Sequence, residues 1–282
     1  MVFRELTVLG KRLVRLRGAD ALPLLHGLLT NEVNSTQPVI YSYLLNSQGR
    51  LLFDLFLYRL AGDDVLLEVD SSAEQSLIKA LNIYKLRRSV KITSSTLSAC
   101  VAPRPNLSLD VPVLIQEADP RLPELGYKLV VETPPSRATV RDDGYRELRY
   151  RLGVPEGSAE LGIGKAIPLE SNGDHLKAIS FEKGCYIGQE LTARAYHTGV
   201  VRKRYMPLKF YDLVQEFQPG SDIAVLNENN AKVGVLKAAL GNRGLGLMRI
   251  KECLEAQVLM TTVNDIAVQL DVQIPTWWPK NR

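Results

Sequence analysis

The C-terminal part of the chain sets the strongest constraint on the fold. From Tyr205 onward, short apolar runs alternate with turns rich in Gly, Asn and Asp, as in YMPLKFYDL, DIAVLNENNAKVGVLKAAL, GLGLMRI, AQVLMTT and IAVQLDV. Several short strands joined by such turns are typical of a small all-β barrel or sandwich. We therefore predict a boundary near residue 204, which separates a larger region over 1–204 from a β domain over 205–282.

The larger region mixes helices and strands. Residues 11–18 alternate apolar and basic side chains, as a half-buried strand does, and Asp20 is placed to cap a helix over 21–33. No regular strand–helix–strand repeat follows. This region is therefore predicted to be α+β.

A second helix is predicted over 72–87, because Ser71 and Glu74 stand at the spacing of a capping box. The remaining elements follow from apolar periodicity and from turn residues. Strands are predicted at 41–46, 50–60, 64–70, 90–95, 97–102 and 127–132, the first three as an antiparallel meander. Proline-rich connectors are predicted at 102–112 and 116–126, a helix over 138–154 that stops before Pro155, and a glycine-rich loop at 156–175.

Composition and charge exclude several classes of protein. The formal charge is only +4 over 282 residues, and the basic runs Arg87–Arg88 and Arg202–Arg204 lack interleaved aromatics. No apolar run reaches the length of about 18 residues that a membrane helix needs. We therefore predict no nucleic-acid partner and no membrane span, and a monomer when the protein is alone. The first residues also lack the apolar core of a secretory signal.

The cysteines limit the metal sites that the chain can build alone. Cys100, Cys185 and Cys253 are far apart, and the sequence has no CxxC and no Cys/His zinc spacing. A self-contained iron–sulfur cluster normally takes four protein ligands, usually cysteines. Neither a disulfide framework nor a complete cluster site is therefore expected, and a reducing compartment is favoured.

The sequence KGCYIGQELTAR places Cys185 in a turn before a predicted helix. Gly184 permits an unusual backbone φ, and the helix N-terminus together with Lys183 favours a thiolate. Three interpretations are open: a small buried residue, a nucleophile paired with His175 or His197, or one ligand of a metal site that a partner or a small thiol completes. No nucleophile motif supports the second, and the small number of cysteines favours the third.

A second group of polar residues is a candidate for ligand contacts, namely Asn31, Asn46, Asp54 and Glu170. The two asparagines also suit turns at the ends of apolar elements. Asp54 interrupts an apolar strand, where an unpaired buried carboxylate would be costly, unless alternation places it on a solvent face. Glu170 is able to accept hydrogen bonds from a heterocycle, or is simply exposed.

The segments RGADALPLLHGLLTNEV, YLLNSQGRLLFDLFLY, PRLPELGYKL, RYRLGVPEG, IPLESN and KGCYIGQELTAR together resemble the folate-binding YgfZ/GcvT superfamily. The Lys-Gly-Cys-Tyr-Ile-Gly-Gln-Glu block makes the chain most similar to the mitochondrial iron–sulfur cluster assembly factor branch. The resemblance covers essentially the whole chain. It implies a ring of three domains, two α+β domains interleaved in sequence and a small C-terminal β-barrel.

The resemblance also bears on catalysis. Aminomethyltransferases of this superfamily use tetrahydrofolate and carry an Asp-Asp pair where this chain has Phe53 and Asp54. The loss of one carboxylate predicts a protein that is not an enzyme. The alternative is a tetrahydrofolate-dependent one-carbon transferase, whose folate pocket would use the four polar residues Asn31, Asn46, Asp54 and Glu170.

For the branch with the Lys-Gly-Cys motif, the resemblance implies a role in maturing [4Fe–4S] proteins in the mitochondrial matrix. The implied partners are A-type iron–sulfur carrier proteins, and the implied cofactor is a cluster held transiently between Cys185 and the partner. The residues expected to support the motif are Lys183, Gly184, Tyr186, Gly188, Gln189, Glu190 and Arg194. Those expected to contact an acidic partner or the anionic cluster are Arg202, Lys203 and Arg204.

Overall fold

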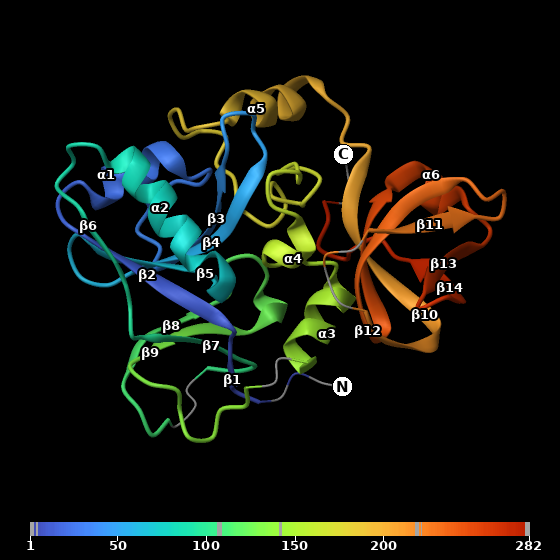
Figure 1. The fold of residues 1–282 in the computed structure, drawn as a ribbon, viewed down its shortest axis with the longest axis horizontal. Helices are drawn as coiled ribbons and strands as arrows, with labels where there is room; N and C mark the ends of the chain where they lie inside the picture. Colours follow the sequence, from blue (N-terminus) through green and yellow to red (C-terminus); the bar gives the residue numbers. More distant parts are fainter. Residues whose placement is uncertain are drawn as a thin grey trace.

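The computed structural model describes residues 3, 5–105, 109–140, 143–217, 220 and 222–279. Three sheets organise these residues into three lobes (Figure 1). Two open sheets lie on one side of the molecule, and a closed barrel lies on the other. Within the described residues, no helix has the length and apolar character needed to cross a membrane.

The first sheet is antiparallel, with the strand order β3-β4-β5-β2-β6. Its strands are β2 (Lys11–Arg17), β3 (Val39–Leu45), β4 (Leu51–Arg59), β5 (Asp64–Asp70) and β6 (Lys91–Ser94). The predicted meander of β3, β4 and β5 is confirmed. Leucines of the helices α1 (Ala21–Leu28) and α2 (Glu74–Lys85) pack against one face of this sheet.

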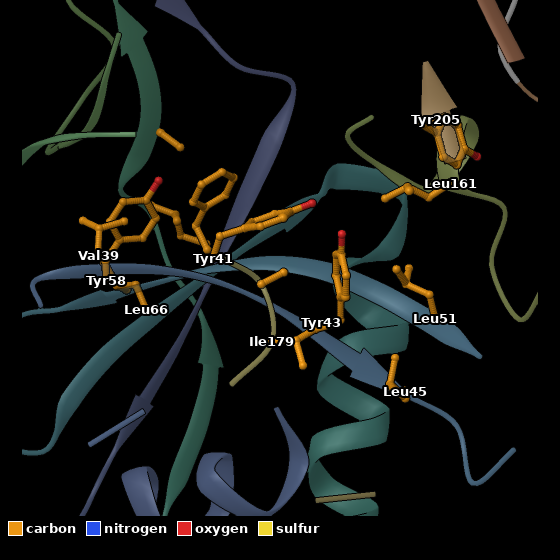
Figure 2. Close-up of a cluster of buried hydrophobic side chains, with 14 of the residues drawn as sticks. Val39, Tyr41, Tyr43, Leu45, Leu51, Tyr58, Leu66, Leu161, Ile179 and Tyr205 are labelled. Atoms are coloured by element: carbon orange, nitrogen blue, oxygen red, sulfur yellow. The ribbon is translucent and has the colours of Figure 1, made fainter. Parts of the chain in front are cut away.

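The central strands of this sheet are buried on both faces, so the alternation of side chains decides which core each residue joins. Ile40 packs toward the helices, whereas Tyr41 and Tyr43 join a cluster that includes residues of all three sheets (Figure 2). The same rule places Phe53 of β4 among the helix leucines and Asp54 on the tyrosine side. Asp54 therefore does not lie on a solvent face.

The second sheet has the order β1-β7-β9-β8. Its strands are β1 (Thr7–Val8), β7 (Ser98–Ala102), β8 (Val113–Ala118) and β9 (Tyr127–Val131). The chain starts in this sheet, leaves to build the whole first sheet and then returns, which confirms the predicted interleaving. Strand β8 was not predicted, and the proline-rich connector expected over 116–126 begins inside it.

A long connection then leads to the barrel. It contains the helices α3 (Asp143–Leu152) and α4 (Ser158–Leu161), a turn-rich stretch over 162–188, and α5 (Gln189–Thr198). In Figure 1, α5 lies at the top of the molecule beside the β3–β4 hairpin, and its C-terminal end leads toward the barrel. The expected loop after residue 155 is thus correct except for the single turn of α4.

The third sheet closes into a barrel in the order β10-β12-β11-β13-β14, which confirms the predicted C-terminal β-barrel. The elements are β10 (Lys203–Phe217), β11 (Ile223–Asn227), β12 (Lys232–Arg249), α6 (Ile250–Glu255), β13 (Leu259–Val263) and β14 (Ile266–Val272). The predicted boundary at residue 204 falls inside β10, so the division into 1–204 and 205–282 stays a prediction.

Three local predictions about helix ends differ from the structure because distant groups compete for the same atoms. Helix α1 ends at Leu28 rather than at residue 33, since Leu29 turns extended and pairs with Leu44 as an isolated bridge. The Ser71 hydroxyl donates to the Gly10 carbonyl at 2.8 Å and does not cap α2. Asp20 holds the expected N-cap position, but its carboxylate accepts a hydrogen bond from the Ser89 amide instead.

Candidate functional site

The turn that carries Cys185 is attached to the C-terminal end of α1 on both sides of the cysteine. The Lys183 Nζ atom donates to the carbonyl of His26 at 2.7 Å and to the carbonyl of Leu29. The Ile187 amide donates to the Gly27 carbonyl at 3.2 Å. The last carbonyls of a helix lack intrahelical partners, so α1 offers acceptors where the turn needs them. The turn is thereby held in place two residues before and two residues after Cys185.

Cys185 is exposed, and the other two thiols are buried. Burial raises the pKa of Cys100 and of Cys253 to about 12, which keeps both as neutral thiols at physiological pH. Cys185 is therefore the thiol that a metal or a partner is able to reach. The interpretation of Cys185 as a buried small residue does not hold for this structure.

The two glycines of the motif play different roles from those expected. Gly184 does not adopt a positive φ, and a Cβ atom there would meet only the His26 Nε2 atom, at 3.7 Å. The expectation of an unusual backbone at Gly184 was therefore wrong. Gly188 has φ +79°, and a Cβ atom there would lie 2.3 Å from the Asn46 carbonyl oxygen. Gly188 thus supports the motif through a close internal contact with the turn between β3 and β4.

Gln189 and Tyr186 complete the turn. The Tyr186 amide donates to the Gln189 Oε1 atom at 3.2 Å, so Gln189 bonds to the backbone of the turn. The Tyr186 ring is buried, with the Lys183 ammonium 5.1 Å from its centroid. Helix α5 takes Gly188 as its N-cap, so Cys185 lies ahead of the helix rather than in its first turn. Glu190 is exposed in that first turn.

The surroundings of Lys183 combine burial with opposite charge. Burial lowers the pKa of Lys183 to about 8, and Glu32 opposes that shift. Glu32 also lies 3.3 Å from the His26 Nδ1 atom, which in turn lies 3.3 Å from the Asn34 amide nitrogen. Lys183 thus anchors the turn and places a positive charge beneath it. His175 lies 3.8 Å from Asp174 and beside the Trp278 ring, and the His197 ring lies against Tyr196.

The three basic residues at the start of the barrel do not form one patch. Arg202 is exposed and Lys203 is half-buried. Arg204 is buried, and its guanidinium holds both oxygens of Asp174 at 2.7 Å and the Leu169 carbonyl at 2.8 Å. Arg204 is therefore an internal residue, and its predicted contact with an acidic partner or an anionic cluster was wrong. Arg194 is exposed on α5.

The two asparagines predicted for a folate pocket have structural hydrogen bonds. The Asn31 Nδ2 atom donates to the carbonyls of Tyr41 and Lys177, at 2.8 and 2.7 Å, and its Oδ1 atom accepts the Glu32 amide. The Asn46 Oδ1 atom accepts the amides of Gln48 and Arg50 in the β3–β4 turn. Both side chains therefore shape loops, as their alternative interpretation predicted.

Asp54 is enclosed by groups of the protein. Its Oδ2 atom accepts the Tyr41 hydroxyl at 3.2 Å and the Gly157 amide at 3.0 Å, and Lys11 attracts it electrostatically. Burial outweighs Lys11 and raises the pKa of Asp54 to about 6. Phe53, where the resemblance to aminomethyltransferases led us to expect a second carboxylate, packs among the leucines of α1 and α2 on the other face of the sheet.

Glu170 lines a hollow of about 320 Å³ beside Lys165, Lys237 and Tyr205. Burial raises its pKa, against the attraction of Lys203 and Arg50. The four residues predicted for folate therefore do not converge on one pocket. Two belong to turns, one lies in the core, and one faces a cavity that the others do not line. This arrangement does not fit a folate.

Comparison with known proteins places the chain in a family. The mitochondrial iron–sulfur cluster assembly factors IBA57 of Mus musculus and Homo sapiens are each 36% identical to it, over 96% of this chain and 84% of theirs. A homologue from Pyricularia oryzae is 33% identical over 86% of the chain. This chain belongs to the IBA57 family.

Two further comparisons agree with the architecture of this IBA57-family chain. A family model described as the CAF17 C-terminal beta-barrel domain matches residues 202–280. The crystal structure of the glycine cleavage system aminomethyltransferase T from Bartonella henselae superposes with a TM-score of 0.74, over 97% of this chain and 86% of that one. Its sequence identity is 15%, so this likeness concerns the fold alone.

The sequence prediction missed a buried network of charges between the sheets of this IBA57-family protein. Glu68 of β5 accepts the Lys128 ammonium of β9 at 2.7 Å and the Tyr58 hydroxyl. Arg121, fully buried, bridges Asp119 and Glu156, each at 2.8 Å. The available signal was a lone charge inside an apolar run, Glu68 in DVLLEVD and Lys128 in YKLVV. Such residues are rarely buried unless paired, and here they join the first two sheets.

Proposed function

We propose that this protein is an iron–sulfur cluster assembly factor of the mitochondrial matrix and not an enzyme. The names of its IBA57 relatives support a role in cluster assembly and a mitochondrial location. The resemblance of the Lys-Gly-Cys motif supports the finer statement. The protein assists maturation of [4Fe–4S] proteins together with an A-type carrier, and the cluster is cargo that Cys185 and the carrier's ligands hold transiently between them.

The observation that carries this proposal is the exposed Cys185 on a turn anchored at both ends. One thiolate supplies one ligand, so a cluster at this position needs further ligands from another protein. The hydrogen bonds of Lys183 and Ile187 fix the position of the cysteine turn before the partner binds. A ligand held in its bound geometry loses less conformational entropy on binding, which favours a shared site.

The alternative, a tetrahydrofolate-dependent one-carbon transferase, needs a pterin site with an available carboxylate. The Oδ2 atom of Asp54 already accepts two internal donors, and Phe53 replaces the second carboxylate. The arrangement of these residues therefore favours the assembly factor.

The proposal is tested by mixing the protein with an A-type carrier that holds a [2Fe–2S] cluster, under reducing conditions with added iron. Formation of the [4Fe–4S] product is followed by its absorbance and paramagnetic signals. Cys185→Ser is expected to abolish the product. Cys253→Ala is the matched control, because that thiol is buried in the barrel core away from the turn.

Two checks make the result decisive. Cys185 is exposed, so its replacement is expected to change the free energy of unfolding by no more than about 0.5 kcal/mol. Native-state alkylation with iodoacetamide should label Cys185 and spare the two buried thiols. If Cys185→Ser gives the wild-type yield of the [4Fe–4S] product, the shared-ligand role is wrong.

A further inference from the structure

A hollow of about 750 Å³ opens directly beside the cysteine turn. Its walls come from the loop after α1, from the start of β3, from the end of β8 and from the stretch between Asp174 and Glu182. Ser180, Phe181 and Glu182, which immediately precede Lys183, form part of the lining. Anything bound in the hollow therefore lies next to the segment that holds Cys185.

The charges that line the hollow are mostly negative. Among the described residues that line it, Lys177 supplies the only ammonium, and the carboxylates are those of Glu32, Glu117, Asp119, Asp174 and Glu182. Arg121 pairs with Asp119 at 2.8 Å, Arg204 pairs with Asp174 at 2.7 Å, and Glu32 faces Lys183.

The other two carboxylates of the lining, Glu117 and Glu182, face no such partner among the described residues. Within the part of the chain that the structure describes, neither Glu117 nor Glu182 makes an ion pair. Glu182 is exposed and Glu117 is half-buried. The hollow thus presents two unneutralised carboxylates and one ammonium to whatever enters it.

This lining is unsuited to folate and suited to a cation. The glutamate tail of a folate carries carboxylates of its own, which Glu117 and Glu182 repel. The rings of Phe181 and Tyr196 stack at the wall, with centroids 3.6 Å apart and an angle of 13° between their planes. Aromatic faces attract ammonium and guanidinium groups. The carboxylates and the aromatic wall therefore both favour a cationic ligand.

We propose that this hollow receives an arginine- or lysine-bearing segment of the partner protein that shares the cluster with Cys185. The volume is of the size that accommodates a few side chains, and the lining continues into the cysteine turn. The docked segment would fix the orientation of the partner while Cys185 ligates the cluster. The identity of the partner rests on the proposed function, whereas the charge preference of the hollow does not.

The test uses a capped tri-arginine peptide as the probe and isothermal titration calorimetry on the full chain. The wild-type protein is expected to bind tri-arginine with an affinity that falls as salt is added. Glu117→Gln combined with Glu182→Gln is expected to weaken binding at least tenfold. Glu255→Gln combined with Asp265→Asn is the control, because it removes the same charge from exposed positions on the barrel.

Several outcomes overturn the inference. They are absence of tri-arginine binding, an equal loss of affinity in the control pair, and tight binding of tetrahydrofolate triglutamate. Binding of spermine as tight as that of tri-arginine assigns the hollow to a small polyamine instead of a protein segment. None of these measurements requires a cluster or alters Cys185. A failure here therefore leaves the cluster assay to decide the proposed function separately.

Discussion

Asp54 carries an ionisable carboxyl group buried inside the protein. It stands in an apolar strand, faces the tyrosine cluster and has one oxygen occupied by Tyr41 and Gly157. Burial raises the pKa of Asp54 from 3.8 to about 6 in the folded state. The folded protein thus binds a proton more readily at this site than the unfolded chain does, and the raised pKa gives stability at low pH that is lost as the pH rises.

Asp54→Asn is expected to remove this dependence. Relative to the variant, wild-type protein should lose about 2 kcal/mol of unfolding free energy between pH 4 and pH 7. Urea unfolding of both proteins at each pH measures the difference, and subtraction cancels the other titrating groups. A difference that stays constant across this range would contradict a raised pKa at Asp54.

At the scale of the element, the cysteine turn depends on its contact with the β3–β4 hairpin. Gly188 has a positive φ and lies against the Asn46 carbonyl, whereas Gly184 has neither constraint. Gly188→Ala is therefore expected to cost about 2 kcal/mol of unfolding free energy or more. Gly184→Ala should stay within about 0.5 kcal/mol of wild type.

The same pair of variants separates folding from function in the cluster assay. Gly184→Ala is expected to fold normally, so a loss of [4Fe–4S] product in that variant would locate the close approach of the partner at Gly184. Urea denaturation supplies the stability of each variant. Equal destabilisation by the two substitutions would show that the turn is held differently from the structure described above.

Elements were predictable where local pattern and tertiary packing agree. The β3–β5 meander follows from apolar runs between short turns, and the barrel follows from the spacing of its turns. Helix α1 stops early because Leu29 pairs with Leu44, and Ser71 bonds with Gly10. Contacts between residues far apart in the sequence cannot be predicted from a local sequence pattern.

The candidate site shows the same limit. The count of cysteines singled out Cys185, and the motif supplied its neighbours in sequence. The anchors at Lys183 and Ile187 instead depend on carbonyls of α1, which stands far earlier in the chain. The predicted folate set failed for the same reason, because tertiary hydrogen bonds occupy Asn31 and Asp54.

At the scale of the whole molecule, Arg204 connects the barrel to the rest of the protein. It stands at the start of β10 and pairs with Asp174 from the turn-rich connection. Burial raises the pKa of Asp174, but the hydrogen bonds and the charge of Arg204, together with His175, outweigh burial and lower this pKa. The bridge therefore keeps a charged carboxylate inside the molecule.

Arg204→Met is expected to lower the unfolding free energy by about 3 kcal/mol, because it leaves the Asp174 charge buried without its partner. Arg202→Met, at an exposed position two residues earlier, should change it by no more than about 0.5 kcal/mol. Thermal and urea unfolding measure both. A mild effect of Arg204→Met would mean that the barrel is held to the other lobes chiefly by its apolar contacts.

The strand order of the second sheet has a consequence for synthesis of the chain. Strand β1 pairs with β7, in the register Thr7 with Val101. Thr7 and Val8 are made before the first sheet, and their partner strand β7 is made after it. Until that moment the backbone groups of β1 have no strand to bond with. Strand β1 therefore finds its partner only after every strand of the first sheet has been made.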